Sequence, residues 1–387
     1  MSIAKKIFII STTLLVVAIF FWGIYSFVFK NNSGGIAKEE VKQEPAKEDP
    51  LLKKNKEVVP AKEKIYSITE EAVIAPFLRE RTGTIGYYSF SDGSASEISL
   101  EGENKRFLSS EKLTGLKNVF WSPDGNKVIS QFNNNGLTTF FLYDYQTKSG
   151  KQIKDGVDNI VWTNLGDKII YKYYDAQSKE RSLNIADPDG TNWKKMADLD
   201  FKNMGIAPIP ATSLISFWNF PNAFEATQMK MIPLVGGEPK IIFSEKFGAD
   251  YLWSPSGEKA LVSFSDQKSG TNMNLAIINN QGGEFQNLGI PTMVSKCVWS
   301  KDNQTVYYAL PGGISAGSVM PNDYQEGKVT TQDTFWSVDI ATGKKSRIVE
   351  LDKMKGVYDA SNLFLSPEND ALFFVNRTDG KLYRINL

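Results

Sequence analysis

The segment Trp121-Ser-Pro-Asp-Gly-Asn-Lys-Val128 recurs along this chain of 387 residues. In each clear copy an apolar residue follows the lead residue by seven places, and two degenerate copies keep the same offset. The lead residues form one series: Leu78, Trp121, Trp162, Ala207, Trp253, Trp299 and Leu365. Successive lead residues are 41 to 46 positions apart up to Trp299, and the last interval is 66. One repeat period therefore covers most of the chain.

The second repeat unit shows what each copy is expected to form. Val119–Ser122 and Val128–Phe132 are predicted strands, joined by a tight Ser-Pro-Asp-Gly turn in which proline presets φ and glycine accepts a positive φ. Thr138–Tyr145 is a third predicted strand and Lys151–Lys154 a short outer one. Four strands in a period of about 40 to 50 residues are typical of a β-propeller blade. We therefore predict an all-β fold, a seven-bladed β-propeller, with six blades as the alternative if one degenerate unit is not a blade.

The last repeat unit is too short for a complete blade. Only 22 residues follow Leu365, which is room for three strands. An open sheet edge is prone to aggregation, so the missing strand is expected to come from elsewhere in the chain. Lys64–Thr69 precedes Leu78 much as the outer strand Lys151–Lys154 precedes Trp162. We expect residues 64–387 to be the propeller domain, with residues 64–69 as the strand that completes the last blade and closes the ring.

Residues 1–30 are expected to be a transmembrane signal anchor. Ile7 to Phe29 are 23 residues without a charge, enough for a helix to cross the roughly 30 Å hydrocarbon core of a bilayer. The run is too long for a cleavable signal peptide, and no small-residue cleavage site follows it. Lys5 and Lys6 favour an N-terminus in the cytoplasm, which predicts a single-pass protein of the cytoplasmic membrane with the propeller on the extracytoplasmic side.

Residues 31–63 are predicted to be a disordered charged linker. Lysine and glutamate alternate along this segment and aromatic residues are absent from it, so the segment cannot bury enough apolar surface to offset its ordering entropy. A flexible coil of this length has a root-mean-square reach of about 30 Å. The segment is thus expected to act as a tether between the anchor and the propeller.

The composition excludes several kinds of chemistry. Lys plus Arg and Asp plus Glu both number 44, so no surplus of positive charge draws the chain to nucleic acid. There is no histidine, which excludes Ser-His-Asp or Cys-His catalysis and imidazole-ligated metals. The single cysteine, Cys297, can form neither an intramolecular disulfide nor a thiolate metal cluster. We predict no catalytic, cofactor-binding or metal-binding residue and no nucleic-acid partner.

The Trp-Ser-Pro-Asp-Gly-x-Lys signature resembles the TolB-type propeller repeat, a relative of WD-repeat blades. The resemblance covers residues 64–387 and is clearest at Trp121, Trp253 and Trp299. It implies a binding scaffold outside the cytoplasmic membrane, and such blades also occur in the propeller domains of peptidases. It specifies the fold better than the function.

Three local motifs have ordinary structural interpretations. Gly313-Ile-Ser-Ala-Gly317 matches a nucleophile elbow, but without a histidine we interpret it as a flexible loop. Asp187-Pro-Asp-Gly-Thr-Asn192 lacks the ligand order of a calcium loop and is predicted to be a hairpin turn. Cys297 stands two places before Trp299, so both are expected to face the same way, with Cys297 as a small core residue.

Two loops are candidates for binding. Between a strand ending near Leu310 and one beginning near Thr334, the sixth unit carries about twenty residues more than a blade needs, and long loops in compact domains are often functional. Its candidate binding side chains are Met320, Asp323, Tyr324 and Glu326. The fourth-unit loop from Trp218 to Thr227 offers Trp218, Phe220 and Phe224, which we expect to be exposed on the same face. The alternatives are neutral insertion drift for the first loop and packing over the blade edge for the second.

These observations support two hypotheses about function. The first is a membrane-tethered propeller without enzymatic activity that binds an envelope protein or a cell-wall component and contacts the lipid bilayer through residues 7–29. The alternative is a histidine-free hydrolase or lyase that acts on an extracellular glycan or peptide with carboxylates as acid and base. Two carboxyl groups about 5 to 10 Å apart in an axial cleft would favour the enzyme, whereas aromatic and amide side chains without such a pair would favour the binder.

Overall fold

The computed structural model describes residues 63–134, 136–265 and 267–387. The chain divides into two units, Met1–Pro60 and Ala61–Leu387, and the described residues belong to the second. The predicted anchor at residues 7–29 lies outside the described residues, as does the predicted linker except for Glu63. Within the described part of the chain, no helix has the length and apolar character needed to cross a membrane.

The described residues form antiparallel sheets, five of which have four strands. Two of these sheets come from residues 73–152: β2 (Val73–Arg79), β3 (Thr84–Ser89), β4 (Ala95–Ser99), β5 (Arg106–Ser109), and β6 (Leu116–Trp121), β7 (Lys127–Asn134), β8 (Leu137–Asp144), β9 (Ser149–Gln152). The third is β10 (Val157–Trp162), β11 (Ile169–Tyr174), β12 (Arg181–Ala186), β13 (Lys194–Asp198). The other two are β21 (Cys297–Trp299), β22 (Thr305–Leu310), β23 (Thr334–Asp339), β24 (Lys345–Arg347), and β25 (Ala360–Leu365), β26 (Ala371–Asn376), β27 (Leu382–Asn386) with β1 (Ile65–Ser67).

The remaining sheet has seven strands: β14 (Met204–Pro208), β15 (Leu214–Asn219), β16 (Ala226–Pro233), β17 (Lys240–Trp253), β18 (Lys259–Ser265), β19 (Met273–Asn279), β20 (Gln286–Asn287). The long strand β17 joins its two halves. Residues 240–247 of β17 pair with β16, and Phe247 to Trp253 pair with β18. Three short helices complete the described structure: η1 (Val294–Lys296), α2 (Asn322–Gln325) and η2 (Leu351–Lys353).

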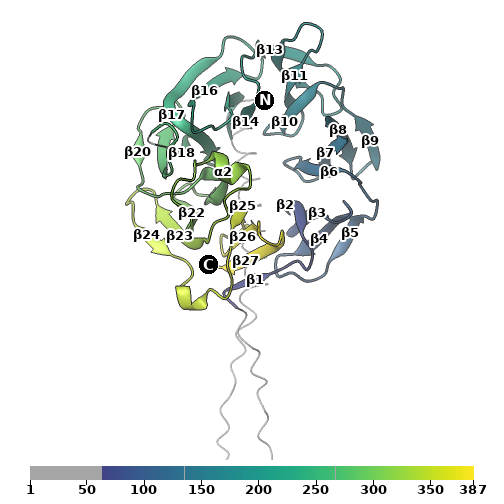
Figure 1. Cartoon of the computed structure of the whole chain (residues 1–387). Helices are drawn as coiled ribbons and strands as arrows, with labels where there is room; N and C mark the ends of the chain where they lie inside the picture. The colour runs from purple at the N-terminus through teal and green to yellow at the C-terminus, as the bar shows by residue number, and fades with distance from the viewer. Residues whose placement is uncertain (1–62, 135, 266) are drawn as a thin grey trace, which may run out of the picture. The chain divides into compact units, whose positions relative to one another are not determined.

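The sheets are arranged around a central axis, as Figure 1 shows. The first strands of the sheets, among them β2, β6, β10, β14 and β25, lie near the axis, and the outer strands β5, β9, β13 and β24 lie at the rim. This arrangement is a β-propeller, so the all-β propeller fold expected from the repeat is confirmed. In the second unit the four strands lie within three residues of their predicted bounds.

The repeated turn has the geometry that its sequence predicts. Gly125 has φ +67°, the Gly125 amide donates to the Ser122 carbonyl at 2.8 Å, and the Ser122 amide donates to the Lys127 carbonyl at 2.9 Å. Gly257 takes the same conformation with φ +69°, and a Cβ there would lie 2.1 Å from the Pro210 carbonyl oxygen. In the copies led by Trp299 and Leu365 asparagine stands in place of this glycine, as Asn303 and Asn369, because asparagine also tolerates a positive φ.

The lead tryptophans connect neighbouring repeat units. Trp121 Nε1 donates to the Ala75 carbonyl at 2.9 Å, and Trp162 Nε1 donates to the Phe120 carbonyl at 2.9 Å. Trp299 Nε1 likewise donates to the Leu252 carbonyl at 3.2 Å. Each indole thus buries its ring between two units and satisfies its single donor on the preceding one, which is the core role expected for it.

Strand β1 completes the last sheet, where it pairs antiparallel with β27 in the register Ile65 with Ile385. The expected closing strand, residues 64–69, contains β1. The Asn386 amide donates to the Lys64 carbonyl at 3.2 Å, and the Leu387 amide donates to the carbonyl of Asp370 at 2.8 Å. Asp370 belongs to the repeated turn, so the chain joins and leaves the propeller on the face that carries these turns, here called the hairpin face.

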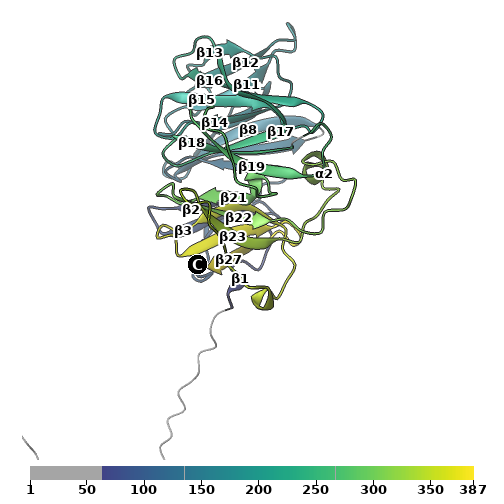
Figure 2. The same ribbon diagram turned by 90° about the vertical axis from the view of Figure 1, so that its left-hand side faces the viewer.

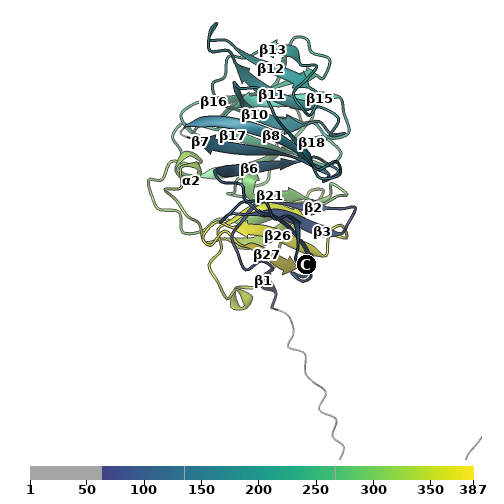
Figure 3. The same ribbon diagram turned by 90° about the vertical axis from the view of Figure 1, so that its right-hand side faces the viewer.

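The opposite face carries residues 311–333, the extra loop between β22 and β23, and is here called the insertion face. Figures 2 and 3 show α2, which belongs to this loop, on the side of the molecule opposite to the C-terminus. The loop begins and ends where expected, since β22 ends at Leu310 and β23 begins at Thr334.

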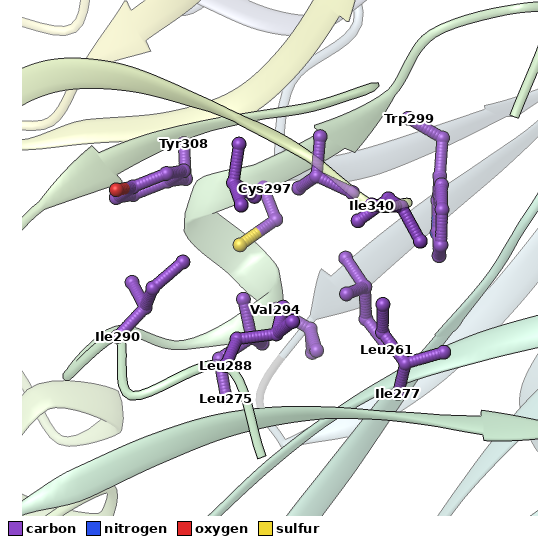
Figure 4. Packing of buried hydrophobic residues seen from close by; sticks show 12 residues of the cluster. Leu261, Leu275, Ile277, Leu288, Ile290, Val294, Cys297, Trp299, Tyr308 and Ile340 are labelled. Carbon is purple, nitrogen blue, oxygen red and sulfur yellow. The ribbon is translucent and has the colours of Figure 1, made fainter. Parts of the chain in front are cut away.

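Apolar residues fill the interfaces between adjacent sheets. Figure 4 shows the apolar cluster, 12 buried residues between β18–β19 and β21–β23 that include Leu261, Leu275, Cys297, Trp299 and Val338. Cys297 and Trp299 lie in the same cluster, and Cys297 is buried. The expectation that Cys297 is a small core residue is therefore confirmed.

Candidate functional site

The loop 311–333 is held to the propeller at both of its ends. Gly312 and Gln332 exchange backbone hydrogen bonds of 3.0 and 2.8 Å at its base. Asp323 Oδ2 accepts a hydrogen bond of 2.7 Å from the Val319 amide just before α2, and its other oxygen lies 3.6 Å from Lys328 Nζ. Asp323 thus stabilises the local conformation of the loop. The segment Gly313–Gly317 is part of this loop and lines a cavity of about 620 Å³ with Met273 and Met293.

The two candidate loops meet on the insertion face. The Ala223 amide donates to Asn322 Oδ1 at 2.8 Å, and Asn322 Nδ2 donates to Asn222 Oδ1 at 3.1 Å. These contacts join residues about 100 positions apart in the chain. The loop between β15 and β16 and the helix α2 therefore form one continuous surface.

A pocket of about 570 Å³ lies where these loops meet. Its walls come from the connection between β13 and β14, the β15–β16 loop and α2. Amide and aromatic side chains predominate in the lining: Asn203, Asn219, Asn222, Asn322, Gln325, Phe201 and Phe220. Four charged residues complete it, together with Pro221: Asp200, Lys202, Glu225 and Glu326. We call it the insertion-face pocket.

The charges around this pocket are nearly balanced. Three carboxylates line it and one lysine, Lys202, lies among them. Two more lysines stand beside the carboxylates, because Lys328 pairs with Glu326 and Lys230 Nζ lies 4.0 Å from Asp200. The pocket walls therefore offer hydrogen-bonding groups and aromatic rings but little net charge. Within the described residues, the side-chain amides of Asn203 and Gln325 make no hydrogen bond with the protein and are exposed.

The candidate binding residues fall into two groups. Phe220 and Glu326 line the insertion-face pocket, and Phe220 is 47% exposed. Met320 is fully buried against Met273, Met293 and Tyr324.

The expectation that Trp218 is exposed was wrong, since only 5% of its surface is accessible. Its ring packs edge-on against Tyr251 at 5.2 Å between centroids, and its Nε1 donates to Asp250 Oδ1 at 3.0 Å. Phe224 is exposed as expected but does not line the pocket. The indole is buried because β15 pairs on both sides and this side chain packs on Tyr251 and Asp250 of β17, a tertiary contact that loop length does not reveal.

Tyr324 also points into the protein, toward a buried ionic cluster that the sequence did not predict. Lys296 Nζ lies 2.7 Å from Asp333 Oδ2 and 2.8 Å from Asp359 Oδ1, and all three side chains are fully buried. Tyr324 donates its hydroxyl to Asp359 Oδ1 at 2.8 Å. These three charged residues and Tyr324 are here called the Lys296 cluster. In the sequence, the one sign of this cluster is Lys296 itself, a charged residue next to Cys297 at the start of an otherwise apolar strand.

The two carboxyl groups of the Lys296 cluster have different environments. Burial raises the pKa of Asp333, and the nearby Lys296 ammonium offsets only part of that effect. Burial also acts to raise the pKa of Asp359. Hydrogen bonds from Lys296, Tyr324 and Thr331, together with the charge of Lys296, outweigh this effect and hold the pKa of Asp359 below its ordinary value. Burial lowers the pKa of Lys296, yet the two carboxylates raise it overall.

The axial region offers a different kind of cavity on the hairpin face. A cavity of about 840 Å³ is lined by inner-strand residues, most of them apolar, such as Phe77, Phe120 and Phe364. Glu80 is its single acidic residue. The pair of carboxylates that would favour an enzyme is thus not found in this axial cavity. In the described ranges, no three of the residues that commonly bind metals (His, Cys, Asp and Glu) form a group able to hold an ion.

Comparisons with known proteins agree with the fold. An oligogalacturonate lyase in complex with manganese matches with 13% identity and a TM-score of 0.60 over 84% of this chain and 93% of that one. The β-propeller domain of the Trilobed protease from Pyrococcus furiosus matches with 13% identity and a TM-score of 0.52 over 82% and 94%. TolB from Acinetobacter baumannii matches with 15% identity and a TM-score of 0.46 over 71% and 62%. Neither a protein-family model nor a curated protein sequence matches the chain. At such identities the likeness to the lyase and to the protease domain, whose TM-scores exceed 0.5, establishes the β-propeller fold alone.

Proposed function

We propose that this protein is a membrane-tethered, extracytoplasmic β-propeller that binds an envelope protein or a cell-wall component in the insertion-face pocket. The observation that carries the proposal is the convergence of two loops from distant parts of the chain on one pocket. Propellers and other rigid β scaffolds commonly present their binding residues on such loops. The pocket lies on the face opposite to the one where the chain joins the propeller, so the backbone at Lys64 does not obstruct it.

The lining indicates the kind of ligand. Unengaged amides at Asn203 and Gln325 can both donate and accept hydrogen bonds, and the exposed ring of Phe220 can cover an apolar surface. With its charges nearly balanced, the pocket suits a neutral polar group with one apolar face, such as a peptide backbone or an uncharged sugar ring. A polyanion such as an oligogalacturonate would require an excess of positive charge.

We also propose that the ring has seven blades. The seven-stranded sheet corresponds to two blades when each half of β17 is counted as a separate strand, the outer strand of one blade and the inner strand of the next. Together with the five four-stranded sheets this makes seven, which agrees with the seven lead residues of the repeat.

Affinity capture of the tagged full-length protein, solubilised in detergent from its own cells, tests the binding site. Phe220→Ala and Gln325→Ala are expected to reduce capture of a specific partner at least tenfold, because both side chains line the pocket without supporting the core. Phe107→Ala is the matched control, since Phe107 is an exposed aromatic on β5, outside the pocket. Equal capture by all three variants would refute the site. Deletion of the whole loop is unsuitable, because it also removes buried Met320 and Tyr324.

The enzyme alternative has one observation in its favour, the three carboxylates that line the insertion-face pocket. Glu225 is the best candidate for an acid or base, because Glu326 and Asp200 each have a lysine nearby. Release of reducing ends or peptides from cell-wall material by the wild type, abolished in Glu225→Gln, would support this alternative. Binding without turnover would support the scaffold.

The proposed localisation has its own test. Residues 7–29 predict that the protein stays with the membrane after alkaline extraction, and a protease added to intact spheroplasts is expected to digest the propeller. Release by alkali, or protection from the protease, would contradict the tethered extracytoplasmic arrangement.

A further inference from the structure

The Lys296 cluster contains the groups needed to form an amide bond between two side chains. We propose that Lys296 Nζ and Asp333 Cγ become joined in a spontaneous intramolecular isopeptide bond, with Asp359 as the general base. The inference is independent of the proposed binding function. It concerns a covalent modification within the propeller, and it requires no other molecule.

The reacting groups are close and shielded from water. Lys296 Nζ lies 2.7 Å from Asp333 Oδ2. Since a carbon–oxygen bond is about 1.2 Å long, the nitrogen lies no more than about 4 Å from the carboxyl carbon. The three charged side chains have no solvent-accessible surface. Exclusion of water favours condensation over hydrolysis of the product.

The hydrogen bonds assign a role to each oxygen of Asp333. Asp333 Oδ2 accepts a hydrogen bond of 2.7 Å from the Ala360 amide as well as that from Lys296. A backbone amide aimed at this oxygen stabilises the negative charge that develops there when the carbon is attacked. Asp333 Oδ1 is buried without a hydrogen-bond partner. It is the oxygen free to take a proton and leave.

Asp359 is placed to transfer protons. Its Oδ1 is 2.8 Å from Lys296 Nζ, and donors from Tyr324 and Thr331 hold it as a carboxylate. The opposed pKa directions of the two carboxyl groups fit these roles, because a protonated Asp333 is the electrophile and an ionised Asp359 the base. Arg377 Nη1 lies 3.6 Å from Asp359 and balances its charge once the lysine charge is gone.

The reaction balances without an oxidant, a reductant or a cofactor. The Lys296 ammonium first gives one proton, through Asp359, to Asp333 Oδ1, which leaves a neutral amine and a carboxylic acid. The nitrogen lone pair then attacks Cγ of Asp333 and forms the carbon–nitrogen bond. Asp359 takes a second proton from the nitrogen and passes it to the Oδ1 hydroxyl, which departs as water when the carbon–oxygen bond breaks. The third proton stays on the amide, and Asp359 returns to its carboxylate form.

The bond would remove two charges from the interior and connect residues 37 positions apart. A buried ion pair carries a large desolvation cost, and a neutral amide largely avoids this cost. The link would join η1, just before the sheet β21–β24, to the end of the loop 311–333. It would hold the base of the insertion-face loop in place.

Mass spectrometry of the purified full-length chain tests the proposal. The denatured protein is expected to be lighter than its sequence by one water, about 18 Da. After trypsin digestion, tandem mass spectrometry should find one branched peptide in which residues 269–301 are linked through Lys296 to Asp333 of residues 329–344. Separate, unmodified peptides 269–296 and 329–344 from the folded wild type would overturn the proposal, and so would a link from Lys296 to Asp359.

Three variants sharpen this test. Lys296→Arg keeps the charge but lacks the nucleophilic amine, and Asp359→Asn lacks the base, so both are expected to show the full unmodified mass. Lys301→Arg is the control, because Lys301 is exposed and pairs with Glu80, and it should keep the branched peptide. The result for the wild type stands even if a variant fails to fold, since it is measured on the native sequence.

Discussion

Lys296 and Cys297 are consecutive residues, yet their side chains enter two different interiors. Cys297 lies in the apolar cluster with Trp299 and Leu275, whereas Lys296 lies in the Lys296 cluster with Asp333 and Asp359. Consecutive side chains near a strand start point to opposite faces, and this sheet has a neighbour on both faces. The apolar cluster tolerates many shapes because hydrophobic burial is non-directional. The ionic cluster is stable only if nearly every donor and acceptor is paired.

The largest expected effect comes from removing Lys296 from the Lys296 cluster. Lys296→Met leaves two carboxyl groups buried with neither the cation nor the amide bond that Lys296 can supply, so we expect the free energy of unfolding to fall by about 3 to 5 kcal/mol. Lys301→Met is the matched control, because this lysine forms an exposed pair with Glu80 and should change stability by at most about 1 kcal/mol. Denaturant unfolding measures both. Equal losses in the two variants would show that the buried cluster contributes no more than a surface ion pair.

The apolar cluster is expected to respond somewhat less strongly. Leu275 is fully buried there, and Leu275→Ala should lower the free energy of unfolding by about 3 to 4 kcal/mol through lost transfer energy and a residual cavity. Leu165→Ala is the control, since Leu165 is 85% exposed and its loss should cost less than about 0.5 kcal/mol. The same denaturant experiment applies. A loss below 1 kcal/mol at Leu275 would mean that the cluster relaxes around the deletion.

Asp250 is a buried carboxyl group that, unlike those of the Lys296 cluster, has no cation beside it among the described residues. It therefore shows the cost of burial alone. Burial raises its pKa to about 6, although Tyr251 and Trp218 donate hydrogen bonds to it, and no ion pair with Asp250 is found among the described residues. Because the folded pKa lies above the ordinary value of 3.8, the folded state binds more protons between these pH values, and stability falls as pH rises from about 4 to 6.

Asp250→Asn keeps an acceptor for Trp218 and removes the titration. We expect the variant to gain up to about 3 kcal/mol relative to the wild type between pH 4 and pH 7, since each pKa unit corresponds to about 1.4 kcal/mol. Urea unfolding of both proteins across this range provides the measurement. Parallel stability curves would show that Asp250 does not titrate in this window.

Cys297 is expected to show the smallest effect. Burial raises the pKa of its thiol, and its Sγ lies 3.3 Å from the Met293 carbonyl, which accepts the hydrogen bond. Cys297→Ala should cost about 1 kcal/mol, because one small group leaves the apolar cluster. In the native protein the thiol should react with a maleimide at least a hundredfold more slowly than in urea. Rapid labelling of the native protein would show that the apolar cluster opens readily.

Particular residues show how much of the structure could be predicted from the sequence. The lead tryptophans predicted both the period and their own burial, since a large aromatic residue at a fixed offset from a tight turn serves the same role in every unit. Loop length indicated where an extra segment leaves the sixth repeat unit. It did not indicate that Met320 and Tyr324 point inward while Glu326 points into a pocket, because those orientations depend on neighbours from other sheets.

The repeat itself determined the all-β propeller, its turns and the core role of Cys297, because these follow from local backbone preferences and from the alternation of side chains along a strand. The insertion-face pocket and the Lys296 cluster were decided only by the tertiary structure. Asn222 meets Asn322 across 100 positions, and Lys296 meets Asp359 across 63. No local pattern encodes such pairs, since the closing of the ring is what brings the sheets that carry them together.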